Sequence, residues 1–218
     1  MAQIFHPFTN AFSKATIFGG VFLLAALAFT CDQINRSAYV TEANVIREQP
    51  VPFSHEHHVS GLGIDCRFCH TTVETSAFAG MPATEVCMGC HSQIWKDSPM
   101  LAPVRESFRT GQPIKWTRVN DLPDFVYFNH SIHIHKGIGC ESCHGRVDQM
   151  PLTWRAKSLQ MSWCLECHKH PEKFQRDRDD IFRFGNFVTD ETQAKHDQLV
   201  NKYRVVTKQL VDCGICHR

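Results

Sequence analysis

Five copies of one short pattern constrain this 218-residue chain more than any other feature. Each copy reads Cys-x-x-Cys-His, and we number them motifs 1 to 5 in chain order. Two cysteines three residues apart can form thioethers to both vinyl groups of one porphyrin, and the adjacent histidine then lies under the iron as its proximal ligand. The pattern predicts five covalently bound c-type haems. The thioether residues are Cys66, Cys69, Cys87, Cys90, Cys140, Cys143, Cys164, Cys167, Cys213 and Cys216, and the proximal histidines are His70, His91, His144, His168 and His217.

Zinc and disulfides explain the pattern less well than haem does. Paired Cys-x-x-Cys sites can bind zinc, but zinc has no need of a histidine directly after every second cysteine. Disulfides would use the cysteines and leave all five histidines unexplained. With 11 Cys and 14 His in the chain, five such patterns are not an accident of composition.

The composition indicates a mainly α chain with many loops. Five haems would supply much of the interior, because so short a chain cannot build an apolar core beside every cofactor. We therefore expect short helices and a fold whose stability depends on the haems. The formal net charge is +1 and the charges are mixed, without a basic stripe, which argues against nucleic acid as a partner. Many Lys and Arg side chains are expected to pair with haem propionates.

The segment before the motifs predicts a membrane anchor. Residues 15–31 are uncharged and mostly apolar, and a helix continuing to residue 36 is long enough for a bilayer if Lys14 snorkels. We expect residues 1–14 to be a short cytoplasmic N terminus, 15–36 a transmembrane signal anchor and 37–52 a linker. A signal peptide cleaved after Ala28 and a lipid on Cys31 are the alternatives. The haem part is expected in the periplasm, an oxidising compartment.

An internal repeat organises the rest of the chain. Phe-x-His-x-x-His begins at Phe53 and again at Phe128, and each copy is followed by a Gly-containing turn and two motifs. We interpret this as two haem-pair modules, with the fifth haem appended. The insert holds four prolines, which favours loops over a long helix, and a helix is expected from about residue 190. The predicted modules are residues 53–95 and 128–175, with a haem-free insert at 96–127 and a helical spacer plus the fifth haem site at 176–218.

The same repeat predicts the distal ligands of four haems. Histidines three apart on a helix are displaced by a turn and can reach two different irons. The repeated positions are His55, His58, His130 and His133. His57 adjoins His58 and can substitute for it. One iron remains without a histidine, and a methionine thioether, from Met161 or Met150, would complete its coordination and raise its potential.

The chain resembles a known family over much of its length. The runs PVPFSHEHHVSGLGIDCRFCH, SAFAGMPATEVCMGCHSQIW, DLPDFVYFNHSIH and GRVDQMPLTWRAKSLQMSWCLECH are similar to the pentahaem cytochrome c subunit of alternative complex III, a bacterial quinol:electron acceptor oxidoreductase. The resemblance runs from Pro50 to His168 and includes the insert. It is weaker after Pro171, although the last motif is in place.

The resemblance implies an electron-transfer subunit with no catalytic site of its own. It would relay electrons in the bacterial inner membrane to periplasmic acceptors or a terminal oxidase. The implied partners are an iron–sulfur subunit related to molybdopterin oxidoreductases, quinol-binding membrane subunits and a monohaem cytochrome c. Two other functions stay open: a multihaem reductase with an open haem, and a stand-alone quinol dehydrogenase.

Overall fold

The computed structural model describes residues 4–185 and 193–217. The chain divides into two compact units, Met1–Glu42 and Ala43–Arg218. The structure is mainly helical, as the composition predicts. Among the described residues there is no strand, only isolated β-bridges such as Ala43 to Arg155 and Ile46 to Trp154.

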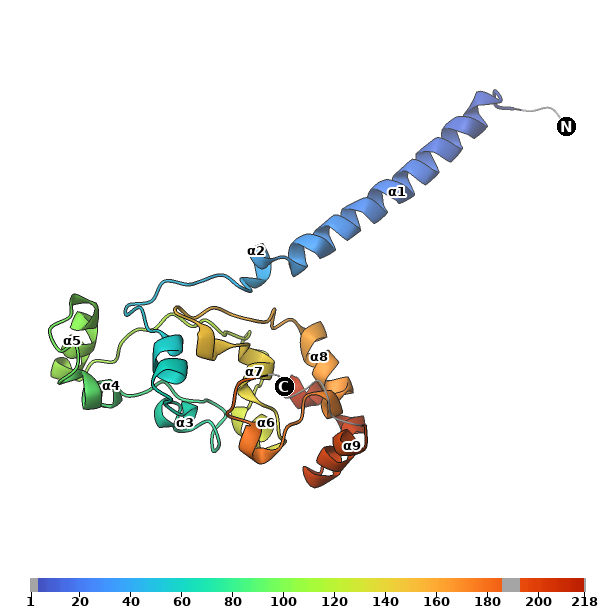
Figure 1. Ribbon diagram of the computed structural model, residues 1–218. Helices are drawn as coiled ribbons and strands as arrows, with labels where there is room; N and C mark the ends of the chain where they lie inside the picture. Colours follow the sequence, from blue (N-terminus) through green and yellow to red (C-terminus); the bar gives the residue numbers. More distant parts are fainter. Residues whose placement is uncertain (1–3, 186–192, 218) are drawn as a thin grey trace. The chain divides into compact units, whose positions relative to one another are not determined.

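The first unit contains the long helix α1 (Phe8–Arg36) and the short α2 (Ala38–Thr41) (Figure 1). α1 has no buried residue and is long and apolar enough to cross a membrane. It begins seven residues before the predicted start at residue 15 and ends at the predicted residue 36. Its first turns are helical although Lys14 interrupts the apolar run, because charge does not stop a helix.

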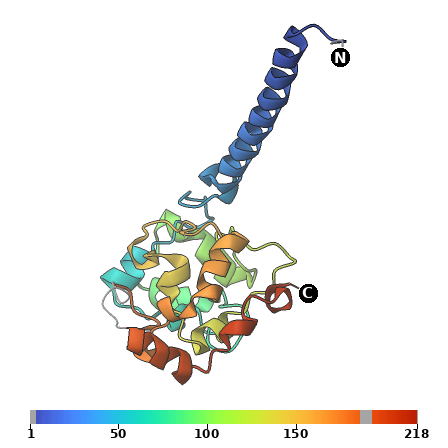
Figure 2. The same ribbon diagram turned by 90° about the vertical axis from the view of Figure 1, so that its right-hand side faces the viewer.

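The second unit consists of short helices joined by loops (Figure 2). Residues 53–127 contain the π-helix, three α-helices and one 3-10 turn, and the other described helices of this unit follow after residue 127. Its helices are a π-helix at Glu56–Gly61, α3 (Cys66–Cys69), α4 (Thr84–His91), a 3-10 turn at Pro99–Leu101, α5 (Ala102–Thr110), α6 (His130–His135), α7 (Cys140–His144), 3-10 turns at Val147–Gln149, Pro171–Lys173, Arg178–Asp180 and Thr207–Gln209, α8 (Met161–Lys169), α9 (Gln193–Lys202) and α10 (Cys213–Cys216).

The apolar core of this unit is small and split. One cluster is Val51, Leu101 and Val104, and a second is Val73, Ile134 and Ile181. Cys87 of motif 2 packs against the first cluster. Neither cluster is large, which agrees with a fold whose interior is completed by bound cofactor.

The insert contains a helix that the prolines did not lead us to expect. Pro103 lies in the first turn of α5, where its missing N–H costs no hydrogen bond. The helix ends at Gly111, whose φ of 69° provides a left-handed C-cap. α5 is joined to α4 by a 2.7 Å hydrogen bond between Thr84 and Ser107. The insert therefore packs against the motif 2 helix rather than forming a loop throughout.

The helix predicted from about residue 190 is present as α9. Its expected first residues, 190–192, lie outside the described part of the chain. Residues 43–46 of the predicted linker form bridges to residues 154 and 155.

Candidate haem-binding sites

Every motif forms a helical turn. The first cysteine is the first helical residue of α3, α7 and α10, and it is the fourth residue of α4 and α8. Residues three apart lie on one side of a helix, so each turn presents its two thiols together. The alternation of the two arrangements follows the predicted repeat, with motifs 1 and 3 alike and motifs 2 and 4 alike.

The cysteines do not pair with one another as disulfides. All eleven lie in the described part of the chain and none forms a disulfide. Burial raises the pKa of Cys143 to about 11 and of Cys167 to about 12. Among the described residues, no group of three or more His, Cys, Asp or Glu side chains is placed to hold a metal ion by itself.

The two Phe-x-His-x-x-His segments have the same side-chain geometry. Phe53 contacts His55 edge-on at a ring-centre distance of 4.9 Å and stacks on His58 at 4.5 Å. Phe128 contacts His130 edge-on at 4.7 Å and stacks on His133 at 4.5 Å. Each phenyl ring thus contacts two imidazoles, one edge-on and one by stacking, and packs against both.

Three of the predicted distal histidines face a proximal histidine. The ring centres of His58 and His91 are 6.2 Å apart, those of His130 and His144 are 6.4 Å apart, and those of His133 and His168 are 6.2 Å apart. The interplanar angles are 63°, 5° and 38° in the same order. Motifs 2, 3 and 4 therefore each have a second imidazole opposite the one in the motif.

These separations fit a metal held between the rings. Two imidazoles that bind one metal from opposite sides, through bonds of about 2.0 Å, have ring centres roughly 6.3 Å apart. Imidazoles in direct van der Waals contact would be closer. The residues present therefore fit bis-histidine haem at motifs 2, 3 and 4.

The motif histidines are oriented by hydrogen bonds from Nδ1. A ligating histidine commonly donates its second ring N–H to a carbonyl or carboxylate, which leaves the other nitrogen free for the metal. At His144 the Asn120 amide nitrogen lies 3.2 Å away, and a half-turn of that amide would present its oxygen as the acceptor. The other Nδ1 atoms lie 2.7 Å from the Gly80 carbonyl oxygen for His70, 3.0 Å from Ile94 for His91, 2.7 Å from Leu210 for His168 and 3.1 Å from Phe125 for His217.

The predicted distal histidines are oriented in the same way. His58 and His133 each place Nδ1 2.7 Å from the carbonyl oxygen four residues earlier. Nδ1 of His130 lies 2.8 Å from the Ala77 carbonyl oxygen, and that of His55 lies 3.0 Å from the Thr153 hydroxyl. In all of these rings, Nε2 is the nitrogen left for a metal.

Burial keeps several of these imidazoles neutral, which metal ligation requires. Desolvation lowers the pKa of His55 to about 4 and that of His144 to about 4. Burial also lowers the pKa of His133. The site thus disfavours the protonated ring, which could not bind a metal.

Motifs 1 and 5 have no ring pair of this kind among the described residues. His55 lies close enough to His70 for the two rings to interact electrostatically. His217 contacts the Phe125 ring at 5.9 Å. Met161 is the first residue of α8 and is 60% exposed, whereas Met150 is 1% exposed. The Met150 carbonyl accepts a hydrogen bond from the Glu56 amide, which places Met150 beside the π-helix.

Three further described histidines, His57, His135 and His170, are not paired with a motif histidine, although the His57 ring contacts that of His58 edge-on at 5.6 Å. His57 is exposed and stacks on Trp95 at 6.0 Å, so His58 and not His57 faces His91. His135 is exposed, and His170 lies 3.3 Å from a Glu172 carboxylate oxygen.

Sequence reasoning missed the groups that hold Nδ1. Most are backbone carbonyls, which every residue type has, so no sequence signal marks them. Phe53 and Phe128 did carry a signal, since both belong to the repeated pattern.

Comparison with known proteins gives a relative that is a multihaem cytochrome. The chain is 39% identical over 143 residues to the multihaem cytochrome c subunit of the menaquinone reductase of Nitratidesulfovibrio vulgaris, an alignment that covers 56% of this chain and 68% of the relative. No family model matches the chain. The chain belongs to this multihaem cytochrome c family. Its cofactor is therefore covalently bound c-type haem, and its role is electron transfer.

The relationship explains the small core of this multihaem cytochrome. A protein that binds several porphyrins covalently gains apolar interior from them, and the peptide needs fewer buried side chains. It also explains why so many histidines are oriented by Nδ1 contacts, because each axial imidazole must keep one orientation toward its iron.

Proposed function

We propose that this multihaem cytochrome binds five haems, one at each motif, and relays electrons within a membrane-bound, quinone-linked respiratory complex. The observation that carries the proposal is the set of three imidazole pairs with ring centres 6.2–6.4 Å apart, each ring also held through Nδ1. When bound, haem supplies reversible one-electron chemistry. The polypeptide supplies axial ligands and fixes their orientation.

The proposed ligand sets follow the ring pairs. His70 pairs with His55, and His217 is proposed to pair with a methionine. Met161 is preferred over Met150 for that role, because Met161 lies one turn before Cys164 of motif 4, and His168 of motif 4 contacts the Leu210 carbonyl just before motif 5. The other sets are His91 with His58, His144 with His130 and His168 with His133.

Six-coordinate sites favour relay over substrate chemistry. A haem with two protein ligands has no position at which a small substrate can bind. Such sites suit an electron-transfer subunit of a larger enzyme better than a reductase with an open haem or a quinol dehydrogenase that acts alone.

The partners and location are proposed from the relative and from the family resemblance. The relative is a subunit of a menaquinone reductase, and the sequence resembles the cytochrome of alternative complex III. We propose assembly with an iron–sulfur subunit, quinol-binding membrane subunits and a monohaem cytochrome c. α1 would anchor the chain in the bacterial inner membrane, with the haem unit in the periplasm and electrons passing to periplasmic acceptors or a terminal oxidase.

Haem counting and low-temperature EPR test the relay function. The purified full chain should contain five haems by pyridine haemochrome assay and mass spectrometry. All should be low-spin when oxidised, and none should bind carbon monoxide when reduced. A high-spin centre that binds carbon monoxide would support the reductase instead, and fewer than five haems would contradict the proposed stoichiometry.

Membrane extraction tests the anchor. The full chain should stay with the membrane after carbonate washing, and the N-terminal sequence of the mature protein should still include residues 15–31. A mature protein beginning at Phe29 and released by the wash would identify a signal peptide.

A further inference from the structure

The order of the motifs in the chain differs from their order in space. Each Phe-x-His-x-x-His segment serves two sites, so its two motifs must be neighbours. His58 faces motif 2, and His55 lies near His70 of motif 1, with which we have proposed to pair it, while His130 and His133 face motifs 3 and 4. The position of the motif 1 and 2 pair relative to the motif 3 and 4 pair, and the position of motif 5, follow from contacts between segments.

The motif 1 and 2 pair contacts the motif 3 and 4 pair through the segments that follow motifs 1 and 3. The loop after motif 1 contacts the distal segment of the other pair, since the amides of His130 and Ser131 donate to the carbonyls of Ala77 and Ser76. The loop after motif 3 contacts the first distal segment reciprocally. There the Ser60 hydroxyl donates to the Asp148 carbonyl at 2.6 Å.

The positions of the cysteines point the same way. The Cys66 and Cys140 thiols, the first of motifs 1 and 3, lie close enough for each to shift the pKa of the other. Cys69 of motif 1 likewise lies near Cys87 of motif 2. Motif 1 thus lies between motif 2 and motif 3. Figure 1 agrees, with α4 toward one side of the unit, then α3, and α7 and α8 beyond it.

Motif 5 adjoins motif 4. The Leu210 carbonyl, three residues before Cys213, accepts from Nδ1 of His168 in motif 4. Cys164 of motif 4 lies near Cys216 of motif 5, and Cys143 of motif 3 lies near Cys164. The series therefore continues from motif 3 through motif 4 to motif 5.

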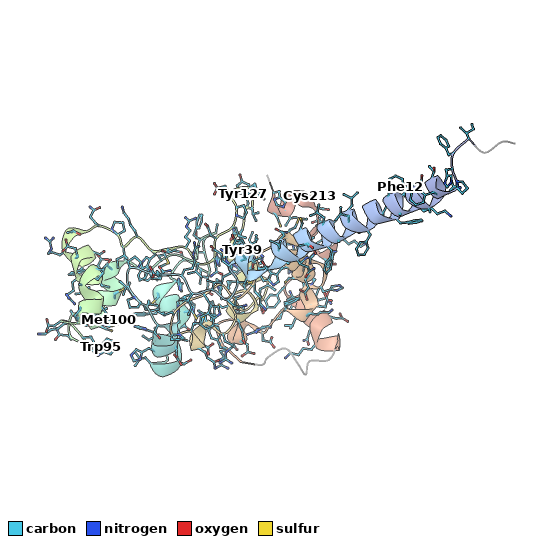
Figure 3. The ribbon with its side chains drawn as sticks, turned by 90° about the horizontal axis from the view of Figure 1, so that it is seen from above. Phe12, Tyr39, Trp95, Met100, Tyr127 and Cys213 are labelled. Atoms are coloured by element: carbon cyan, nitrogen blue, oxygen red, sulfur yellow. The ribbon has the colours of Figure 1, made fainter. Side chains whose placement is uncertain are left out.

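The exposure of the cysteines identifies the ends. Cys90 of motif 2 and Cys213 of motif 5 are exposed, whereas both cysteines of motifs 1, 3 and 4 are half-buried. Large apolar side chains are also exposed at each end. Trp95 and Met100 lie together near motif 2, and Tyr127 lies beside Cys213 of motif 5 (Figure 3).

We infer that the five sites form one unbranched series in the order motif 2, 1, 3, 4, 5, and that electrons enter and leave through motifs 2 and 5. This inference rests on the proposed five-haem function. It assigns the two redox-partner surfaces to opposite ends of the series, one around Trp95 and Met100 and the other around Tyr127 and Cys213. Motif 1, although first in the chain, is internal.

Two haem-deletion variants of the full chain test the order. Cys66→Ala with Cys69→Ala removes the motif 1 attachment, and Cys87→Ala with Cys90→Ala removes that of motif 2. EPR then measures magnetic coupling among the four remaining ferric haems. In the inferred order, loss of motif 1 leaves one uncoupled low-spin signal, from motif 2, while loss of motif 2 leaves all four coupled. A series in chain order predicts the reverse and would overturn the inference.

A third variant keeps all five haems. It tests the order even if the two haem-deletion variants do not fold. His58→Met should give motif 2 a His/Met signal that differs from the others. That signal should couple to one neighbour, and coupling to two neighbours would refute a terminal position. Fewer than five haems in the unmodified chain would contradict the proposed function, whereas five haems with an internal motif 2 would contradict the order alone.

Discussion

At the scale of single residues, the histidines of this protein are oriented before any iron is considered. Nδ1 of His70, His168 and His133 lies 2.7 Å from a backbone carbonyl oxygen. Such contacts fix the tautomer and the ring plane, and they raise the basicity of the nitrogen that faces the metal. The ring angles should therefore persist in the haem-loaded protein and be visible by spectroscopy.

The ring angles predict different EPR spectra for two of the sites. Nearly parallel axial imidazoles give a rhombic low-spin ferric signal, while rings at a large angle give a signal with a higher maximum g value. We expect the rhombic type from the His130 and His144 pair at 5° and the high-g type from the His58 and His91 pair at 63°. His58→Met should remove the high-g signal alone. Its persistence in that variant would contradict the pairing.

The phenyl rings between the distal histidines can be tested by truncation. Phe128→Leu removes contacts to His130 and His133. Aromatic pairs of this kind contribute about 0.5–1.5 kcal/mol beyond area burial, so the free energy of unfolding should fall by about 1 kcal/mol or more in denaturant titration. The EPR signals of two haems should change and the other three should not.

Phe53→Leu is the matched variant. It should change a different pair of signals, those of the haems served by His55 and His58. If either variant shifted all five signals equally, the phenyl rings would have only a general packing role.

At the scale of elements, the α4 and α5 pair gives the motif 2 site most of its peptide packing. Val104 on α5 is 3% exposed and belongs to the cluster that contacts Cys87. The insert thus provides motif 2 with a core that the other sites do not share. A substitution in the buried face of α5 should therefore alter mainly the haem site at motif 2.

Val104→Ala tests this local role. Removing two buried methyl groups should lower the free energy of unfolding by about 2 kcal/mol, and the midpoint potential of one haem, at motif 2, should shift. The control is Val206→Ala, at a side chain that is 59% exposed, which should change stability by less than about 0.5 kcal/mol. A uniform shift of all potentials would mean that α5 supports the unit as a whole.

At the scale of the whole molecule, the peptide core is too small to hold the second unit together. Its two buried clusters, around Val104 and around Ile134, are separate. Ordering a chain costs about 1–2 kcal/mol per residue in backbone entropy, and clusters of this size offset little of it. Covalent haem is therefore expected to be a condition of folding.

Loss of haem should consequently unfold this unit. Chain produced without c-type haem attachment is expected to show little helix by far-UV circular dichroism beyond that of α1, and to be rapidly cleaved by protease. The haem-loaded protein, prepared in the same detergent, is the control. A haem-free chain with native-like helix content and protease resistance would contradict this expectation.

Much of the candidate site can be predicted from local pattern. The spacing Cys-x-x-Cys-His places two thiols and an imidazole by covalent geometry alone, and the repeat at Phe53 and Phe128 marks the distal segments. The mainly helical fold was predicted correctly. α5 was not, because the prolines of the insert gave no indication that Pro103 would lie in a first helical turn, where it is tolerated.

The assignment of distal partners and the spatial order of the sites required tertiary structure. Whether His58 or His57 faces His91 depends on the turn of the π-helix and on Trp95, which lies far from both in sequence. The hydrogen bond from the His130 amide to the Ala77 carbonyl joins residues from different predicted modules and has no local signature. The sequence by itself determined which atoms can bind haem, because that chemistry is local. Tertiary structure decided which sites are neighbours, because distant segments become neighbours only when the chain folds.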